Sequence, residues 1–266
     1  MSSIHPTAII DRGAEIGSNV EIGPYCVIGP HVTIGDNTRL YNHVTIMSKT
    51  TVGKGNIIYP NAVLGAPPQD LKYKGTLTAL EIGDNNQIRE AVTVHAGTET
   101  GVGVTRLGSG NLLMINTHIG HDSQFGSKCI LGNNTMIAGH VECGDGVAMM
   151  GGVGVHHFVT IGNFAYIGGY SRIHHDVPPF VKVDGADKVR ALNNVGLKRH
   201  GFTEDDIEAL EDAARRLFFG REKPFAIVLN ELSDGDVNPQ VKQMIDFLHR
   251  RNAGRHGRYL ESLRVK

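Results

Sequence analysis

The sequence predicts an all-β fold with an α-helical cap, in which a long parallel β-helix is followed by a C-terminal α-helical domain. Two observations predict the β-helix. Bulky apolar residues recur at every sixth position over most of the chain, and a small or β-branched residue stands two positions before each of them in the later repeats. The third observation predicts the cap, because after about residue 177 glycine becomes rarer and the apolar residues take up a helical spacing.

The sixfold spacing extends over three stretches of chain. A period of six fits neither an α-helix nor an alternating strand, but it is typical of hexapeptide-repeat β-helices, in which three hexads make one coil of a prism. The bulky residue points into the prism, and glycine permits the turn between faces. The bulky residues are Ile4, Ile10, Ile16, Ile22, Ile28, Ile34, Leu40, Ile46, Val52, Ile58, Leu64; Ile82, Ile88, Val94; and Leu107, Leu113, Ile119, Phe125, Leu131, Ile137, Cys143, Met149, Val155, Ile161, Ile167, Ile173.

One coil contains 18 residues, so residues 18 apart are expected to lie above one another, about 4.8 Å apart, as neighbouring parallel strands do. This spacing predicts three vertical rows on the outside of the prism. The rows are His121, Gly139 and His157; Asp122, His140 and Phe158; and Gly120, Ala138 and His156. A polar patch rich in histidine is therefore predicted on an otherwise apolar column.

Two interruptions are expected to leave the prism as loops. The pattern breaks after Leu64 and returns at Ile82, which predicts that one coil's length of chain leaves as a loop. The second break changes the spacing from Val94 to Leu107 to 13, so seven inserted residues would place His95 one coil below Gly120. We therefore expect a β-helix over residues 1–185, with excursions at about 66–80 and 96–105, and a helical domain over residues 186–266.

The helical domain is predicted to cover the exposed end of the prism and to take part in an oligomer interface, because an open strand edge promotes aggregation. Thr203 and Asp206 form a capping pattern for a helix that stops at Gly220. Further helices are expected at about 192–199, 224–232 and 239–251.

Composition gives boundaries rather than a function. The 266 residues are 40% hydrophobic, and 26 Lys and Arg stand against 27 Asp and Glu, a net charge of −1 that gives no general argument for nucleic-acid binding. Cys26, Cys129 and Cys143 all fall on inward repeat positions, which indicates a reducing compartment. No signal peptide and no transmembrane segment is recognisable, so a soluble, cytoplasmic protein is expected.

The histidine patch points to acyl transfer without a covalent intermediate. His121 followed by Asp122 suits an oriented general base, because the carboxylate would fix the tautomer of the imidazole. Gly139, one coil above, would leave its backbone N–H open as an oxyanion donor. His121 stands out among the histidines because the predicted rows gather others around it, namely His95, His118, His140, His156 and His157. The chain has no Gly-x-Ser-x-Gly motif and no reactive cysteine.

Two other interpretations remain open on the residues alone. Histidines on a hexapeptide prism can also hold a metal, so a zinc-dependent lyase or hydrolase is the second hypothesis. A structural or scaffolding role is the third. Stoichiometric zinc, together with loss of activity on chelation, would favour the second over acyl transfer.

The chain resembles the UDP-N-acetylglucosamine acyltransferase family, which begins lipid A biosynthesis. The resemblance covers nearly the whole chain, and its strongest motifs are Gln69-Asp70-Leu71-Lys72-Tyr73, His118-Ile119-Gly120-His121-Asp122, Ala138-Gly139-His140-Val141, Asp176-Val177-Pro178-Pro179 and Gly196-Leu197-Lys198-Arg199. It implies a homotrimeric left-handed parallel β-helix with a C-terminal helical domain. It also implies transfer of an (R)-3-hydroxyacyl chain from acyl carrier protein to the 3-hydroxyl of UDP-N-acetylglucosamine, in clefts between subunits.

The resemblance also implies roles for individual residues. His121 matches the base, Asp122 its orienting partner and Gly139 the oxyanion donor. No cofactor is implied, since the acyl donor is carried on the phosphopantetheine of acyl carrier protein. Some members acylate an amino-sugar nucleotide instead, and the sequence leaves that alternative open. The substrate-binding positions are Gln69, Asp70, Lys72, His95, His118, His140, His156, His157 (where glutamine is usual), Asn193 for the pantetheine and Arg199 for the nucleotide, with Gly169 and Tyr166 limiting acyl-chain length.

Overall fold

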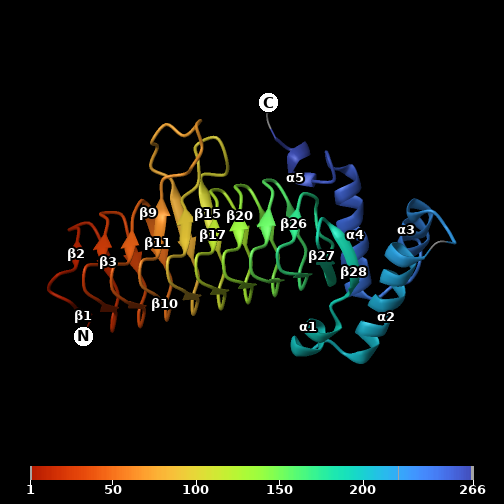
Figure 1. The fold of residues 1–266 in the computed structure, drawn as a ribbon, viewed down its shortest axis with the longest axis horizontal. Helices are drawn as coiled ribbons and strands as arrows, with labels where there is room; N and C mark the ends of the chain where they lie inside the picture. The colour runs from red at the N-terminus through yellow and green to blue at the C-terminus, as the bar shows by residue number, and fades with distance from the viewer. Residues whose placement is uncertain (1, 221, 265–266) are drawn as a thin grey trace.

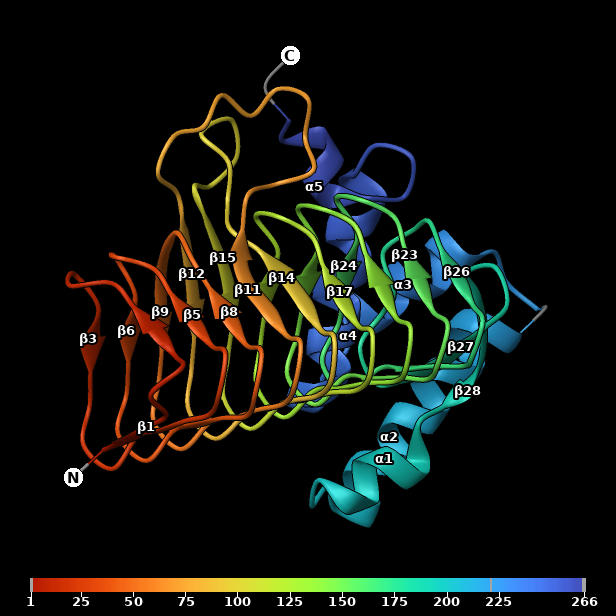
Figure 2. The same ribbon diagram turned by 60° about the vertical axis from the view of Figure 1, so that its left-hand side comes forward.

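The computed structural model describes residues 2–220 and 222–264 and shows a three-sided prism that joins a group of helices at its C-terminal end (Figure 1). The predicted limits of the chain's two parts at residues 1 and 266 lie outside the described residues. Two loops project from one side of the prism, as the turned view shows (Figure 2).

Three parallel sheets form the sides of the prism. The first contains β1 (Ser3–Ile4), β4 (Glu21–Ile22), β7 (Arg39–Leu40), β10 (Ile57–Ile58), β13 (Gln87–Ile88), β16 (Leu112–Leu113), β19 (Ile130–Leu131), β22 (Ala148–Met149), β25 (Tyr166–Ile167), β27 (Val181–Asp184) and β28 (Lys188–Leu192). The second contains β2 (Ile9–Ile10), β5 (Val27–Ile28), β8 (Thr45–Ile46), β11 (Val63–Ala66), β14 (Thr93–His95), β17 (His118–Ile119), β20 (Met136–Ile137), β23 (Gly154–Val155) and β26 (Arg172–Ile173). The third contains β3 (Glu15–Ile16), β6 (Thr33–Ile34), β9 (Lys49–Val52), β12 (Ala79–Ile82), β15 (Val104–Leu107), β18 (Gln124–Phe125), β21 (Glu142–Cys143) and β24 (Thr160–Ile161).

The hexapeptide prediction is confirmed strand by strand. Each predicted bulky residue lies in one of the strands β1 to β26, and those from Ile22 to Ile173 are all buried. Ile4 is 46% exposed because no coil lies beneath it. Neighbouring coils pair in the expected register, as in His118 with Met136 and Ile119 with Ile137. The three cysteines are buried and free, as their inward positions predicted.

The first loop, residues 67–78 between β11 and β12, is shorter than predicted. Val52 pairs with Ile82, 30 residues later, so only 12 residues are added to the ordinary coil of 18. The prediction of a whole extra coil was wrong because Ile82 directly follows Leu64 as the next inward residue, on the next face of the prism. The second loop, residues 96–103 between β14 and β15, adds the seven residues predicted, because Thr93 pairs with His118.

A ladder of buried asparagines runs along one corner of the prism. The Asn86 amide nitrogen donates to Asn56 Oδ1 at 3.0 Å, and the Asn111 amide nitrogen donates to Asn86 Oδ1 at 3.0 Å. Asn111 Oδ1 in turn accepts from the Cys129 backbone N–H at 2.7 Å. Each amide therefore joins two coils, and hydrogen bonding offsets the cost of burying it.

The C-terminal region contains the helices expected and a hairpin that was not. The helical elements are α1 (Asn194–Arg199), α2 (Glu204–Ala214), η1 (Arg215–Phe219), α3 (Phe225–Ser233), α4 (Pro239–Ala253) and α5 (Tyr259–Ser262). Thr203 and Asp206 form the predicted capping box, and Gly220 ends the helical run. The hairpin, β27 and β28, pairs antiparallel at the end of the first sheet and spans the expected boundary at residue 185. Among the described residues, no helix has both the length and the apolar character needed to cross a membrane.

We expect Asn86→Ala to lower the free energy of unfolding by about 3 kcal/mol, because both Asn111 N–H groups that bond to Asn86 Oδ1 lose their acceptor in the core. Urea denaturation measures the change. Gln87→Ala, at an exposed position of the same coil, is the matched control and should have little effect. Equal effects of the two substitutions would contradict a stabilising role for the ladder.

Candidate active site

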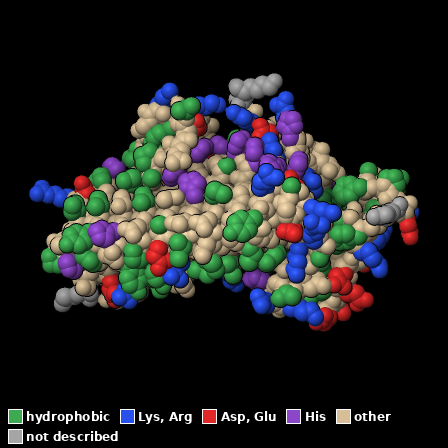
Figure 3. Space-filling model, viewed as in Figure 1, with side chains coloured by type: hydrophobic (Ala, Val, Ile, Leu, Met, Phe, Trp, Pro, Cys, Tyr) green, Lys and Arg blue, Asp and Glu red, His purple; other side chains and the backbone are tan. Residues whose placement is uncertain are grey.

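A groove of about 1300 Å³ lies along the edge where the second and third sheets meet, beneath the two loops. Histidines gather in this part of the surface (Figure 3). Several residues singled out from the sequence line the groove, and they come from the first loop, from β14 and β17 and from three successive turns above them. They are Gln69, Asp70, Lys72, His95, His118, His121, Asp122, Gly139, His140, His156 and His157.

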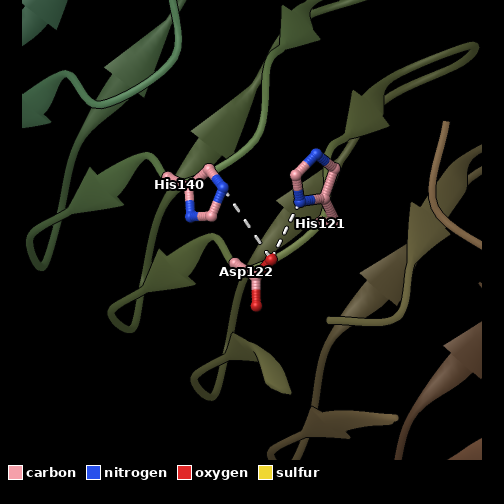
Figure 4. A group of neighbouring side chains, drawn as sticks. All are labelled: His121, Asp122 and His140. Carbon is pink, nitrogen blue, oxygen red and sulfur yellow. Dashed lines mark hydrogen bonds and ion pairs between the residues drawn. The ribbon is translucent and has the colours of Figure 1, made fainter. Parts of the chain in front are cut away.

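His121 and Asp122 form the closest contact between ionisable groups in the groove (Figure 4). His121 Nδ1 lies 2.8 Å from Asp122 Oδ2. Burial raises the pKa of Asp122, but hydrogen bonds from His121 and Thr98 outweigh it and hold the pKa below its usual value. An ionised carboxylate can only accept, so Nδ1 carries the proton and Nε2 keeps its lone pair. The imidazole is thus held in the tautomer that a general base requires.

The second loop anchors the Asp122 carboxylate. Thr98 donates from its backbone N–H to both carboxylate oxygens at 3.1 Å and from its hydroxyl at 2.6 Å, and the Gly103 N–H adds a bond at 3.0 Å. A side chain at Gly101 would collide with the same carboxylate. Sequence reasoning missed these contacts, because the loop has no repeat from which its fold could be predicted.

Gly139 lies where the row of three predicted it, next to the free face of His121. A Cβ placed on Gly139 would be only 2.6 Å from His121 Nε2, so no larger residue fits without displacing the ring. Among the described residues, the backbone N–H of Gly139 has no recorded acceptor, whereas the next N–H, of His140, bonds to His121 O at 2.9 Å. A free donor and a free base therefore lie side by side.

The other histidines surround this pair in contact with one another. The rings of His95 and His118 meet edge to face at 4.7 Å, and those of His121 and His140 at 4.9 Å. His140 also stacks on Phe158 at 4.5 Å, as their shared row predicted. Burial lowers the pKa of His95 to about 4, and it also lowers the pKa values of His118 and His140. These side chains are therefore neutral at pH 7 and can both donate and accept hydrogen bonds.

A metal could be held by one group of the described residues, His121, Asp122 and His140, whose ligand atoms lie within 4.8 Å of one another. Zinc binds carboxylate and imidazole at about 2.0–2.2 Å. Asp122 Oδ2 already accepts hydrogen bonds from Thr98 and from His121. A zinc ion at this place would therefore have to displace the contact that orients His121.

Four predicted residues do not line this groove in the single chain. Asn193 is buried and caps α1, where its side chain accepts from the Gly196 N–H and donates to Phe164 O. Arg199 ends the same short helix. Tyr166 lies on β25 in the first sheet, and Gly169 follows at the turn toward β26, next to Gly151. Conversely, Leu260, Leu263 and Arg264 line the groove although no sequence signal indicated them.

The buried histidines predict that stability falls on acidification. Because the unfolded chain binds more protons than the folded one between pH 6.5 and about 4, the free energy of unfolding decreases as pH falls through this window. For His95 the difference between 6.5 and about 4 corresponds to about 3 kcal/mol. Thermal unfolding measured from pH 7 to pH 4 should show a shallower loss for His95→Gln than for His31→Gln, an exposed control. Identical pH profiles would contradict it.

The comparisons with known proteins agree with this arrangement. Residues 176–257 match a family described as UDP N-acetylglucosamine O-acyltransferase, domain 2, and residues 1–35 and 31–66 match the bacterial transferase hexapeptide family. LpxA of Bacteroides fragilis, a UDP-N-acetylglucosamine acyltransferase, is 37% identical, with a TM-score of 0.88 over 92% of this chain and 96% of its own. LpxA of Acinetobacter baumannii is 42% identical (TM-score 0.87, 93% and 96%), and the Arabidopsis UDP-N-acetylglucosamine acyltransferase is 35% identical (0.82, 96% and 98%). The chain therefore belongs to the UDP-N-acetylglucosamine acyltransferase family.

Proposed function

We propose that the chain transfers an (R)-3-hydroxyacyl group from acyl carrier protein to the 3-hydroxyl of UDP-N-acetylglucosamine, the first step of lipid A biosynthesis. The observation that carries the proposal is the pairing of His121 with Asp122 at 2.8 Å, with Nε2 facing the open amide of Gly139. Family membership supports the choice of substrates.

In this mechanism His121 Nε2 takes the proton of the sugar 3-hydroxyl as that oxygen attacks the thioester carbonyl. The Gly139 N–H donates to the oxygen that becomes negative in the tetrahedral intermediate. The intermediate then collapses, the bond from carbon to sulfur breaks, and the imidazolium returns its proton to the leaving thiolate. Asp122 stays ionised and stabilises the imidazolium, so no bond to the protein forms.

The groove offers complementary contacts to a sugar nucleotide. Gln69, Asp70 and Lys72 from the first loop lie at one end, and Lys72 supplies a positive charge for a phosphate. The neutral histidines His95, His118 and His140, together with His156 and His157, provide donors and acceptors for hydroxyl and acetamido groups. This set is consistent with binding of the acceptor beside His121.

We further propose a homotrimer in which a neighbouring copy completes the site. Asn193 and Arg199, assigned to the pantetheine and the nucleotide, and Gly169 and Tyr166, assigned to acyl-chain length, do not line the groove of their own chain. Placed at a subunit boundary, they would reach the groove of the next copy.

Mass spectrometry of the product made from UDP-N-acetylglucosamine and 3-hydroxyacyl carrier protein tests the function. We expect an O-acylated sugar nucleotide, formed equally well after the protein is treated with a chelator. Product only from the corresponding amino-sugar nucleotide would replace the acceptor in this proposal. Stoichiometric bound zinc whose removal abolishes turnover would favour the metal-dependent alternative, for which His121, Asp122 and His140 are the ligands.

His121→Ala should lower kcat by about a thousandfold, the range usual for loss of a general base. The side chain lies outside the core, so the fold and the oligomeric state should be retained in size-exclusion chromatography. His31→Ala, at an exposed position far down the prism, is the control. Activity within tenfold of the unchanged protein, about 1.4 kcal/mol of barrier, would rule out His121 as the base.

Lys72→Ala should raise KM for the sugar nucleotide by about tenfold and change kcat less, because a lost phosphate contact removes binding in both ground and transition states. Steady-state kinetics with varied nucleotide sugar measures this. Lys74→Ala is the matched control, since Lys74 lies in the same loop but does not line the groove. If the two variants have the same KM, Lys72 does not bind substrate.

A further inference from the structure

The last part of the described chain, residues 254–264, lies across one end of the groove. We call it the C-terminal segment. It follows α4 and contains α5, which lies on the side of the prism from which the two loops project (Figures 1 and 2). Leu260, Leu263 and Arg264 of this segment line the groove, together with Phe158 and Met136 of the prism.

Asp176 bonds the C-terminal segment to the last coil. Its side chain is buried, with Oδ1 accepting from the Thr160 N–H at 2.7 Å and Oδ2 accepting from the Tyr259 N–H at 2.8 Å. The Asp176 N–H donates to Gly257 O at 2.8 Å. The backbone immediately before Leu260 is therefore fixed relative to the prism from two directions.

A second set of contacts fixes the side of the segment that faces the groove. Arg258 donates to His174 O at 2.8 Å and pairs with Glu261 at 3.4 Å, and the two side chains are only 11% and 13% exposed. Arg264 pairs with the same Glu261 and lies over the Phe158 ring at 5.5 Å. The segment is thus held as a rigid wall.

The apolar side chains on this wall are not used by the fold. Leu263 is 59% exposed, and Met136, on the prism side of the same groove, is 57% exposed. The first loop brings Gln69, Asp70 and Lys72 to the groove, whereas the C-terminal segment brings two leucines. Two exposed leucines on a fixed backbone favour an apolar ligand group, because burying them is the favourable step.

We propose that Leu260 and Leu263 contact the acyl chain of the donor and limit the chain length that the groove accepts. The inference rests on the proposed function, because it assumes an acyl donor at this groove. It adds specificity residues from the same chain, whereas Gly169 lies at a different corner of the prism.

The experiment compares kcat/KM for 3-hydroxyacyl carrier proteins of graded chain length with the unchanged protein, Leu260→Ala, Leu263→Ala and Leu263→Phe. Removing methylene groups from the wall should raise kcat/KM for the next longer chain, relative to the optimal one, by about tenfold. Leu263→Phe should shift the preference in the opposite direction. A merely structural role would lower activity with every chain length by the same factor.

Ile227→Ala is the matched control, since Ile227 on α3 is 48% exposed and does not line the groove. Thermal unfolding of each variant verifies that the fold is retained. If the unchanged protein acylates the sugar nucleotide but all leucine variants keep its chain-length profile, the inference is wrong. If the unchanged protein acylates it with no chain length, the proposed function itself fails.

Discussion

The hydrogen-bond ladder between successive coils is the constraint on which the rest of the structure depends. Each strand of two to five residues is too short to be stable alone, and it is stabilised only by the coil below and the coil above. The ladder fixes which side chains share a vertical row. It is this register, rather than any local sequence preference, that brings Gly139 against His121.

The loops provide what the regular coils cannot. An outward-facing aspartate on a prism would be hydrated and free to rotate, but the second loop covers Asp122 and directs Thr98 and Gly103 at its oxygens. The two loops also contact one another, through Glu99 and the Lys74 N–H at 2.6 Å. Interrupting the repeat therefore creates a dry, ordered carboxylate beside the imidazole while the ladder continues beneath it.

Much of this was predictable because a hexad has a defined phase. The inward residues, the rows and the position of His95 follow from counting, and the capping box at Thr203 follows from local chemistry. The length of the first loop did not follow, because any multiple of six restores the inward phase while the face of the prism repeats only every 18 residues. The hairpin, the Thr98 contacts and the C-terminal segment were missed because they depend on non-repeating chain meeting a coil distant in sequence. Residues such as Asn193 and Gly169 could be assigned only by resemblance.

The prism has one covered end and one bare end. The hairpin and the helices close the last coils, whereas the first coil has only one neighbour and leaves Ile4 partly open to water. Opening should therefore begin at the amino terminus and spread coil by coil, as fraying does in linear repeat arrays. Five strands of the second sheet lie between that end and β17. The reactive histidine thus sits behind a sacrificial length of solenoid, and backbone amides near it should exchange with solvent far more slowly than those of the early coils.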